Sequence, residues 1–132
     1  MFSFFSKSSS EKNSNGKFKK AYYCLRSVTS GRVLDIAGGG DKQGTAIIYD
    51  VNKGPNQCFA IQQYGPDYRL KCQAGGYLAV TGDGNGAKLY LDKKKSKGDP
   101  RQLFKLDKRG DSYVVYTGFN RVLDVEGCGK EN

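Results

Sequence analysis

The chain has 132 residues, a formal net charge of +9 and no histidine. This length suits one small domain with one core, and the lack of histidine excludes Ser-His and Cys-His nucleophile pairs. The chain contains 18 glycines and no window with a sustained helical period, which favours an all-β fold. We therefore expect a single all-β domain that is not an enzyme.

The N-terminal region differs in composition from the rest of the chain. Met1–Phe5 is apolar but shorter than the core of a signal peptide, which needs about 7–15 apolar residues, and Ser6–Asn15 is rich in Ser, Lys and Asn. These features predict a disordered basic tail over residues 1–19. We expect no membrane insertion, because so short an apolar patch anchors poorly, and without a signal peptide we predict a cytoplasmic protein.

A fixed period is the strongest signal in the sequence. Leu34, Leu78 and Leu123 each follow a glycine-containing turn and are 44 and 45 residues apart. Gln57-Cys58-Phe59 and Gln102-Leu103-Phe104 repeat at a spacing of 45. A period of this size indicates that one supersecondary unit is reused. The expected repeats are residues 20–64, 65–109 and a partial unit, 110–132.

Each unit is predicted to consist of short strands separated by turns. Asp67–Cys72 alternates polar and apolar residues, as a half-buried strand does. A Leu-x-Ile or Leu-x-Val strand follows, then a glycine-rich turn, an apolar strand (Ala46–Tyr49 or Ala87–Leu91), a loop and Gln-x-Phe. The order of these segments is the same in the first two units.

The ordered set Leu34-Asp35-Ile36, Gly44-Thr45 and Asn56-Gln57-x-Phe59 resembles the repeat of ricin-type β-trefoil lectins. The resemblance covers roughly residues 20–132. It implies a β-trefoil of three four-stranded units around a pseudo-threefold axis, with the phenylalanine of Gln-x-Phe in the shared core. It also implies a non-catalytic carbohydrate-binding module for galactose-type or related sugars, whose partner is a carbohydrate or glycoconjugate.

The third unit is incomplete in this sequence. The first unit runs 26 residues from Asp35 to Ile61, whereas only 8 residues follow Asp124. About two strands are then missing from a closed barrel, which would leave unpaired edges. The chain is a fragment of a longer product, a partner supplies the strands, or the N-terminal segment fills the gap. The composition of that segment argues against the last explanation.

The sugar site implied by the resemblance lies in the first unit. Sugar recognition needs polar groups for the hydroxyls and an aromatic ring for the apolar face. Asp35 would accept hydrogen bonds from the sugar, Asn56 would supply an amide, and Gln57 would brace the loop. Tyr49 is either the aromatic platform or an inward core residue, because the Gly44-to-Asn56 spacing is about one residue short of the family pattern and a one-residue slip reverses a strand's faces.

Asp35 itself has two interpretations: it is either a sugar ligand or the closing residue of an Asx turn. The corresponding positions of the other units differ. Asp124 repeats Asp35 in the third unit, where the platform and amide positions fall in the missing segment. In the second unit Ala79 replaces the aspartate and Arg101 replaces the asparagine, so this unit is either structural or binds a charged ligand.

The lysines of the second unit suggest an alternative function. Lys93, Lys94, Lys95 and Lys97 form either a solvated loop or a patch that attracts phosphates, acidic glycans or lipid headgroups. On the second interpretation the domain is an intracellular trefoil scaffold that binds a protein partner or anionic ligands such as phosphoinositides. No aromatic residues interleave with these lysines, so specific nucleic-acid binding is not expected.

The four cysteines, Cys24, Cys58, Cys72 and Cys128, do not recur at equivalent positions of the repeats. Together with the lack of a signal peptide, this favours reduced thiols in a reducing compartment. There is no Cys-x-x-Cys motif and no histidine, so we expect no metal site. We expect no cofactor either.

Overall fold

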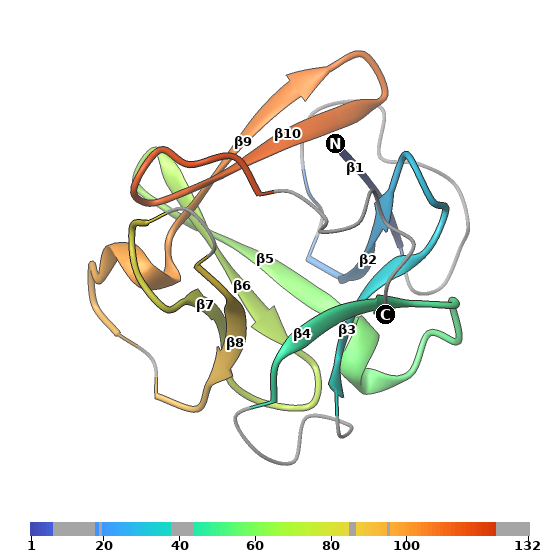
Figure 1. Cartoon of the computed structure of the whole chain (residues 1–132), viewed down its shortest axis with the longest axis horizontal. Coiled ribbons are helices and arrows are strands. Elements are labelled where there is room, and N and C mark those ends of the chain that lie inside the picture. The colour runs from blue at the N-terminus through green and yellow to red at the C-terminus, as the bar shows by residue number, and fades with distance from the viewer. Residues whose placement is uncertain (7–17, 19, 38–43, 85–86, 95, 124–132) are drawn as a thin grey trace.

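The computed structural model describes residues 1–6, 18, 20–37, 44–84, 87–94 and 96–123 (Figure 1). These residues form ten β-strands, together with the short 3-10 segments η2 (Pro55–Gln57) and η3 (Pro100–Gln102). The strands are β1 (Phe2–Ser6), β2 (Tyr22–Ser27), β3 (Val33–Ile36), β4 (Ala46–Tyr49), β5 (Phe59–Tyr64), β6 (Asp67–Cys72), β7 (Tyr77–Val80), β8 (Leu89–Asp92), β9 (Phe104–Arg109) and β10 (Ser112–Thr117). Within the described part of the chain, no helix is long and apolar enough to cross a membrane.

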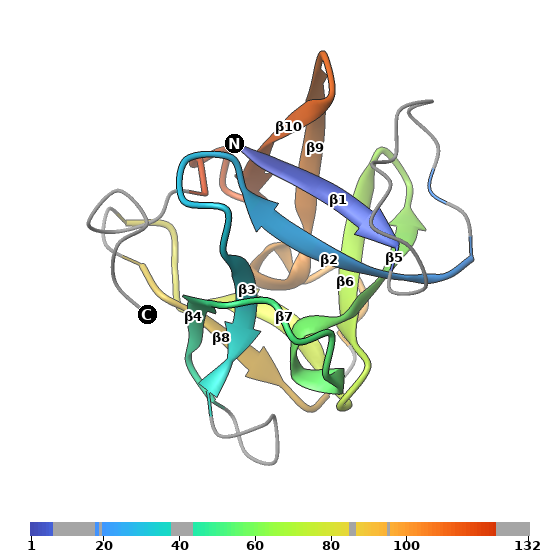
Figure 2. The same ribbon diagram turned by 90° about the vertical axis from the view of Figure 1, so that its right-hand side faces the viewer.

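Six of the strands close into a barrel. Strand β1 pairs with β2, β2 with β5, β5 with β6, β6 with β9, β9 with β10, and β10 returns to β1, all antiparallel. Figure 2 shows β1 running alongside β2. Because each of these strands has two neighbours, the ring presents no unpaired edge. Of the three explanations for the incomplete third unit, the pairing of β1 with β2 and β10 supports the one in which the N-terminal segment fills the gap. The argument from composition against that explanation is wrong.

The register of the barrel repeats three times. In each unit a buried phenylalanine opposes a tyrosine on the first strand of the unit. The three pairs are Phe59 with Tyr23, Phe104 with Tyr68, and Phe2 with Tyr113. Phe2 thus occupies, in the third unit, the position that the phenylalanine of Gln-x-Phe occupies in the first two. A barrel with this threefold repeat and added hairpins is a β-trefoil.

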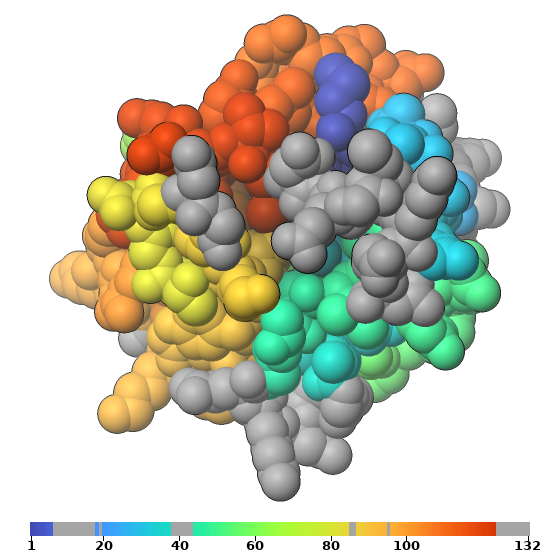
Figure 3. Space-filling view, viewed as in Figure 1, coloured from blue at the N-terminus to red at the C-terminus, as the bar shows by residue number. Residues whose placement is uncertain are grey.

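Strand β1 corrects the prediction of a disordered tail over residues 1–19. Phe2 and Phe4 are each 1% exposed and belong to the main core, and Figure 3 shows β1 between residues of the β9–β10 hairpin and those that follow β2. Phe18 also packs against this core, with its ring centroid 5.1 Å from that of Phe4. The composition of the whole segment obscured a five-residue strand, because the Ser, Lys and Asn residues outnumber its phenylalanines. Residues 7–17 and 19 lie outside the described part.

Two hairpins, β3–β4 and β7–β8, extend from the barrel and meet each other. Thr45 forms a β-bridge with Tyr90, and the Leu91 amide donates to the Gly44 carbonyl at 3.2 Å. The two hairpins lie side by side in Figures 1 and 3. A side chain at Gly44 would collide with the carbonyl oxygen of Ala37, directly after β3, so the close approach of the two backbone segments within the β3–β4 hairpin requires glycine.

The core draws on all three units. The phenylalanines of Gln-x-Phe, Phe59 and Phe104, are buried as expected, and so are Leu34, Leu78 and Leu123. Ile47 and Leu89 are only partly buried. Ile48 and Leu91 are buried instead. Each lies opposite the leucine that recurs in the repeat, Leu34 or Leu78, and shares its inward face.

Candidate functional site

The first unit brings Asp35, Asn56 and Gln57 together. Asp35 lies within β3 and is 5% exposed. Its carboxylate accepts one hydrogen bond from Asn56 Nδ2 at 2.9 Å and one from Gln57 Nε2 at 2.7 Å. Two amide donors fix the plane of the carboxylate, and each of its oxygens retains a lone pair for another donor. These partners are 21 and 22 residues away in the chain, so the described bonds of Asp35 are not those of an Asx turn.

Gln57 connects Asp35 to the loop that follows β4. Its Oε1 accepts from the amides of Asn52 and Lys53 at 2.8 and 3.1 Å, and its Nε2 donates to the Asp50 carbonyl at 2.9 Å as well as to Asp35. The side chain is fully buried. Gln57 therefore holds the loop in place against β3 through hydrogen bonds at both ends of its amide.

Tyr49 is exposed, which rules out the alternative that it is a core residue. Its relative exposure is 45%, and it opposes Val33 in the β3–β4 pair. Opposed residues of an antiparallel pair share a face, as do residues two apart on one strand, so Tyr49 lies on the same face as Asp35. The neighbouring Asp50 carboxylate pairs with Arg32 at 3.4 Å on the surface.

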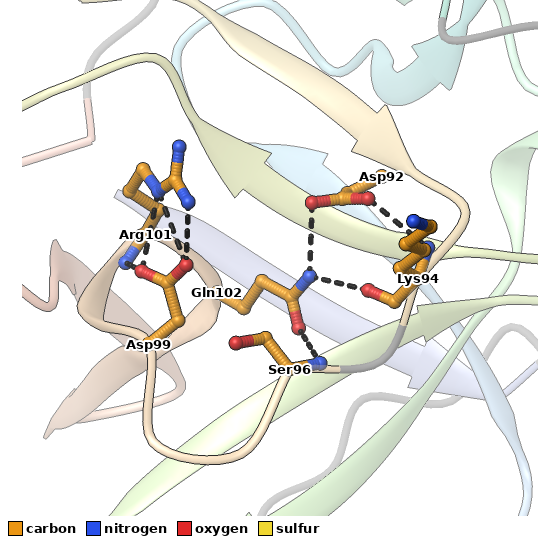
Figure 4. Close-up of polar contacts among 6 residues, drawn as sticks. All are labelled: Asp92, Lys94, Ser96, Asp99, Arg101 and Gln102. Atoms are coloured by element: carbon orange, nitrogen blue, oxygen red, sulfur yellow. Dashed lines mark hydrogen bonds and ion pairs between the residues drawn. The ribbon is translucent and has the colours of Figure 1, made fainter.

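The second unit has the same glutamine but a different carboxylate (Figure 4). Gln102 Oε1 accepts from the Ser96 amide at 3.0 Å, and Nε2 donates to the Lys94 carbonyl at 2.7 Å and to Asp92 Oδ2 at 3.1 Å. Asp92 ends β8 and occupies the register position that Tyr49 has in the first unit. Ala79 stands at the position of Asp35. The carboxylate therefore comes from the opposite strand of the hairpin.

Arg101, which takes the place of Asn56, is engaged by a neighbour. Its guanidinium donates to both oxygens of Asp99 at 2.7–3.2 Å, and its main-chain amide donates to Asp99 Oδ1 at 2.9 Å. The side-chain and main-chain hydrogen bonds from Arg101 lower the pKa of Asp99. In Figure 4 this pair lies to one side of the Gln102 network, and no dashed line joins the two. Arg101 thus stabilises η3 through its cap rather than serving Asp92.

The remaining predicted site residues are dispersed. Lys93, Lys94 and Lys97 are exposed after β8, and Lys93 Nζ lies 3.5 Å from the Gly75 carbonyl. Lys95 and Asp124 lie outside the described residues. Asp92 was not among the predicted site residues. The sequence feature that could have indicated it is an acidic residue two positions after Tyr90 and ten before Gln102.

The comparisons place the chain among trefoils. It matches the family described as "Ricin-type beta-trefoil lectin domain-like" over residues 9–92. No curated protein gives a significant match. Among solved structures, a designed threefold-symmetric protein, ThreeFoil, is 25% identical, with a TM-score of 0.73 over 81% of this chain and 80% of that one.

Two larger proteins share the fold at lower identity. An exo-β-1,3-galactanase from Clostridium thermocellum is 23% identical, with a TM-score of 0.74 over 83% of this chain and 25% of its own. The Polyporus squamosus lectin, solved with the human-type influenza-binding epitope Neu5Acα2-6Galβ1-4GlcNAc, is 15% identical, with a TM-score of 0.70 over 88% of this chain and 44% of its own. The chain thus corresponds to a quarter of one and under half of the other. With the family match over most of its length, the chain belongs to the ricin-type β-trefoil lectin-like domain family.

Proposed function

We propose that this domain is a non-catalytic carbohydrate-binding module whose first unit binds a galactose-type or related sugar. The observation that carries the proposal is the Asp35 carboxylate, which Asn56 and Gln57 orient on the same strand face that carries the exposed Tyr49. Of the first two units, only the first combines a carboxylate at this position with an asparagine before the glutamine.

The proposed binding mode follows from the chemistry of a sugar. Vicinal hydroxyls donate to Asp35, whose plane is fixed before the ligand arrives, so little ordering is needed on binding. The Asn56 amide provides a further polar contact, and the ring of Tyr49 covers the apolar face of the sugar. A shallow site of this kind binds weakly, and several copies of the module would raise the apparent affinity.

Two of the similar structures support a galactose-type ligand. The lectin was solved with an epitope that contains galactose, and the name of the enzyme specifies a galactan substrate. We propose no hydrolysis by this domain, because glycosidases generally use two carboxyl groups that flank one bond. Gln57 donates to both Asp35 and the Asp50 carbonyl, but the carboxylate of Asp50 is paired with Arg32 and so is not placed as a second catalytic carboxyl group.

A titration with galactose and lactose, followed by amide NMR spectra, tests the proposal. We expect the signals of Asn52, Lys53 and Asn56 to shift in the wild type. Asp35→Ala should abolish the shifts, and Tyr49→Ala should weaken binding by roughly tenfold, equivalent to about 1.4 kcal/mol. Asp92→Ala is the matched control, because it removes the glutamine-bound carboxylate of the second unit and should leave binding unchanged. Wild-type spectra that ignore both sugars, or equal binding by Asp35→Ala, would contradict the proposal.

A second candidate is the binding of anionic ligands by the exposed lysines. Lys93, Lys94 and Lys97 follow β8 on the surface, where their charges attract phosphate or acidic glycans over a distance. Such binding should fall steeply with added salt, whereas binding of a neutral sugar should hardly change. Charge reversal at Lys93 and Lys94 should abolish it without affecting the galactose titration.

A further inference from the structure

Two buried thiols from neighbouring strands of the barrel contact each other. Cys24 lies in β2, and Cys58 directly precedes β5. The β2–β5 register pairs Tyr22 with Ala60 and Tyr23 with Phe59, and one further step places Cys24 opposite Cys58. The two sulfur atoms are 4.0 Å apart, and both residues are 0% exposed.

This placement suits a disulfide bond. Directly opposed residues of an antiparallel pair have Cα atoms about 4.5–5.5 Å apart, which lies within the range of about 4.4–6.8 Å that disulfides span. Opposed side chains also point to the same face of the sheet. Rotation of the two thiols toward each other is therefore sufficient, and the strands need not separate.

The thiol pair lies in a small cluster of its own, apart from the main core. Phe5 of β1 opposes Cys24, and these two residues form one buried cluster with Val33 and Cys58. The guanidinium of Arg26 lies 4.5 Å from the centre of the Phe5 ring, and Lys53 Nζ lies 5.8 Å from it. The thiols thus share a fully buried cluster with Phe5, whose ring has two cationic side chains near it.

The cluster favours the protonated form of the Cys24 thiol. The hydrogen bond with Cys58 and burial both raise the pKa of Cys24. Since the thiolate is the form that attacks a disulfide, an oxidant reacts slowly until the cluster opens.

Cys58 also connects this cluster to the candidate sugar site. Its thiol donates to the Lys53 carbonyl at 3.5 Å, and the amide of Lys53 donates to Gln57 Oε1. Cys58 itself follows Gln57 in the chain. Oxidation removes the thiol hydrogen that the Lys53 carbonyl accepts, so a change at Cys58 reaches the loop that Gln57 connects to Asp35.

We propose that Cys24 and Cys58 form a redox-active dithiol site that small disulfides, such as glutathione disulfide, convert into an intrachain disulfide. One cysteine thiolate attacks a glutathione sulfur, breaks its S–S bond and releases one glutathione. The second cysteine then attacks the mixed disulfide, forms the Cys24–Cys58 bond and releases the other glutathione. The protein loses two electrons and two protons, and the two glutathione thiols receive them.

The test begins with the reduced full chain at equilibrium with buffers of increasing glutathione disulfide content. Remaining thiols are blocked with N-ethylmaleimide, and the peptides are mapped by mass spectrometry. We expect a Cys24–Cys58 cross-link to accumulate to one per chain while Cys72 is recovered as a blocked thiol. Cys24 and Cys58 recovered as thiols in the most oxidising buffer, or Cys58 joined to Cys72 or Cys128, would overturn the proposal.

Two variants separate the chemistry from slow access. Phe5→Ala removes the ring that packs in the same cluster as the two thiols and should speed cross-linking several-fold. Rapid blocking of both thiols in this variant without any cross-link would also refute the proposal. Cys72→Ala is the matched control, because Cys72 is buried and donates to Pro55 of the same loop at 3.4 Å. In this control, oxidation should still shift the amide signals of Asn52 and Lys53, and in Cys24→Ala it should not.

Discussion

The first and second units place the same glutamine at the same point of the trefoil but give it carboxylates from different strands. Gln57 binds Asp35 on β3, whereas Gln102 binds Asp92 on β8, at the register position that Tyr49 has in the first unit. Both glutamines also bind the main chain of the loop before them. The glutamine brace is therefore the constant feature, and the source of the carboxylate is variable.

This exchange changes what the hairpin presents to solvent. In the first unit the carboxylate is on the first strand of the hairpin, β3, which we call the inner strand, and an exposed tyrosine is on the second, β4, the outer strand. In the second unit the carboxylate is on the outer strand, β8, and Tyr90 of that strand opposes Ala79 on the inner strand, β7. In both units the side-chain amide of the buried glutamine donates to a carboxylate. Only the first unit has the arrangement from which we infer sugar binding.

The largest expected effect extends the comparison to the third unit. Phe2→Ala removes a side chain equivalent to Phe59 and should destabilise the protein by about 3–5 kcal/mol, as large-to-small core changes do. Denaturant unfolding of Phe2→Ala and Phe59→Ala should give similar losses, and Tyr49→Ala should give almost none. A Phe2→Ala protein as stable as the wild type would show that β1 does not complete the third unit.

The next effect tests the shared brace. Gln57→Ala removes one of the two amide donors to the buried Asp35 carboxylate and the acceptor of two loop amides, so it should cost about 3 kcal/mol. Gln102→Ala removes the acceptor of one loop amide and one donor to the half-buried Asp92, so we expect a loss of about 2 kcal/mol in the free energy of unfolding. Urea unfolding of both variants measures the difference. A larger loss for Gln102→Ala would reverse our ranking of the two networks.

A transplant sharpens the comparison further. Ala79→Asp with Asp92→Tyr and Arg101→Asn gives the second unit the residues of the first at three positions. If the carboxylate on the inner strand is what makes a sugar site, this variant should gain a second set of galactose-induced shifts around Gln102. Asp92→Tyr with Arg101→Asn alone is the control and should gain none. A folded triple variant with only the original shifts would refute this requirement.

The smallest effect concerns Asp99, whose pKa is lowered by Arg101. A carboxyl group with a lowered folded-state pKa adds stability above its unfolded pKa of about 3.9, and this stability is lost as the pH falls through the folded value. Asp99→Asn should therefore be slightly less stable than the wild type at pH 7, and the gap should close in acid. Urea midpoints at pH 7 and in strong acid provide the measurement. A gap that widens in acid would contradict the assigned direction.

The sequence by itself determined the repeat and the all-β class, because both depend on local pattern: the period of 45 and the alternation along strands. The resemblance to the ricin-type repeat implied the grouping of Asp35, Asn56 and Gln57, which hydrogen bonds bring together in the structure. The sequence did not determine whether Tyr49 is exposed, because a one-residue shift in the loop spacing exchanges the two faces of a strand. The pairing of Tyr49 with Val33 in the structure determines its face.

The tertiary structure decided how the barrel closes and what holds the second unit. Phe2–Ser6 is too short to stand out against the polar segment after it, and its pairing with β2 and β10 joins residues from opposite ends of the sequence. Asp92 and the contact between Cys24 and Cys58 likewise depend on cross-strand register. Local pattern cannot specify these pairings, because they form only when distant strands align in the closed barrel.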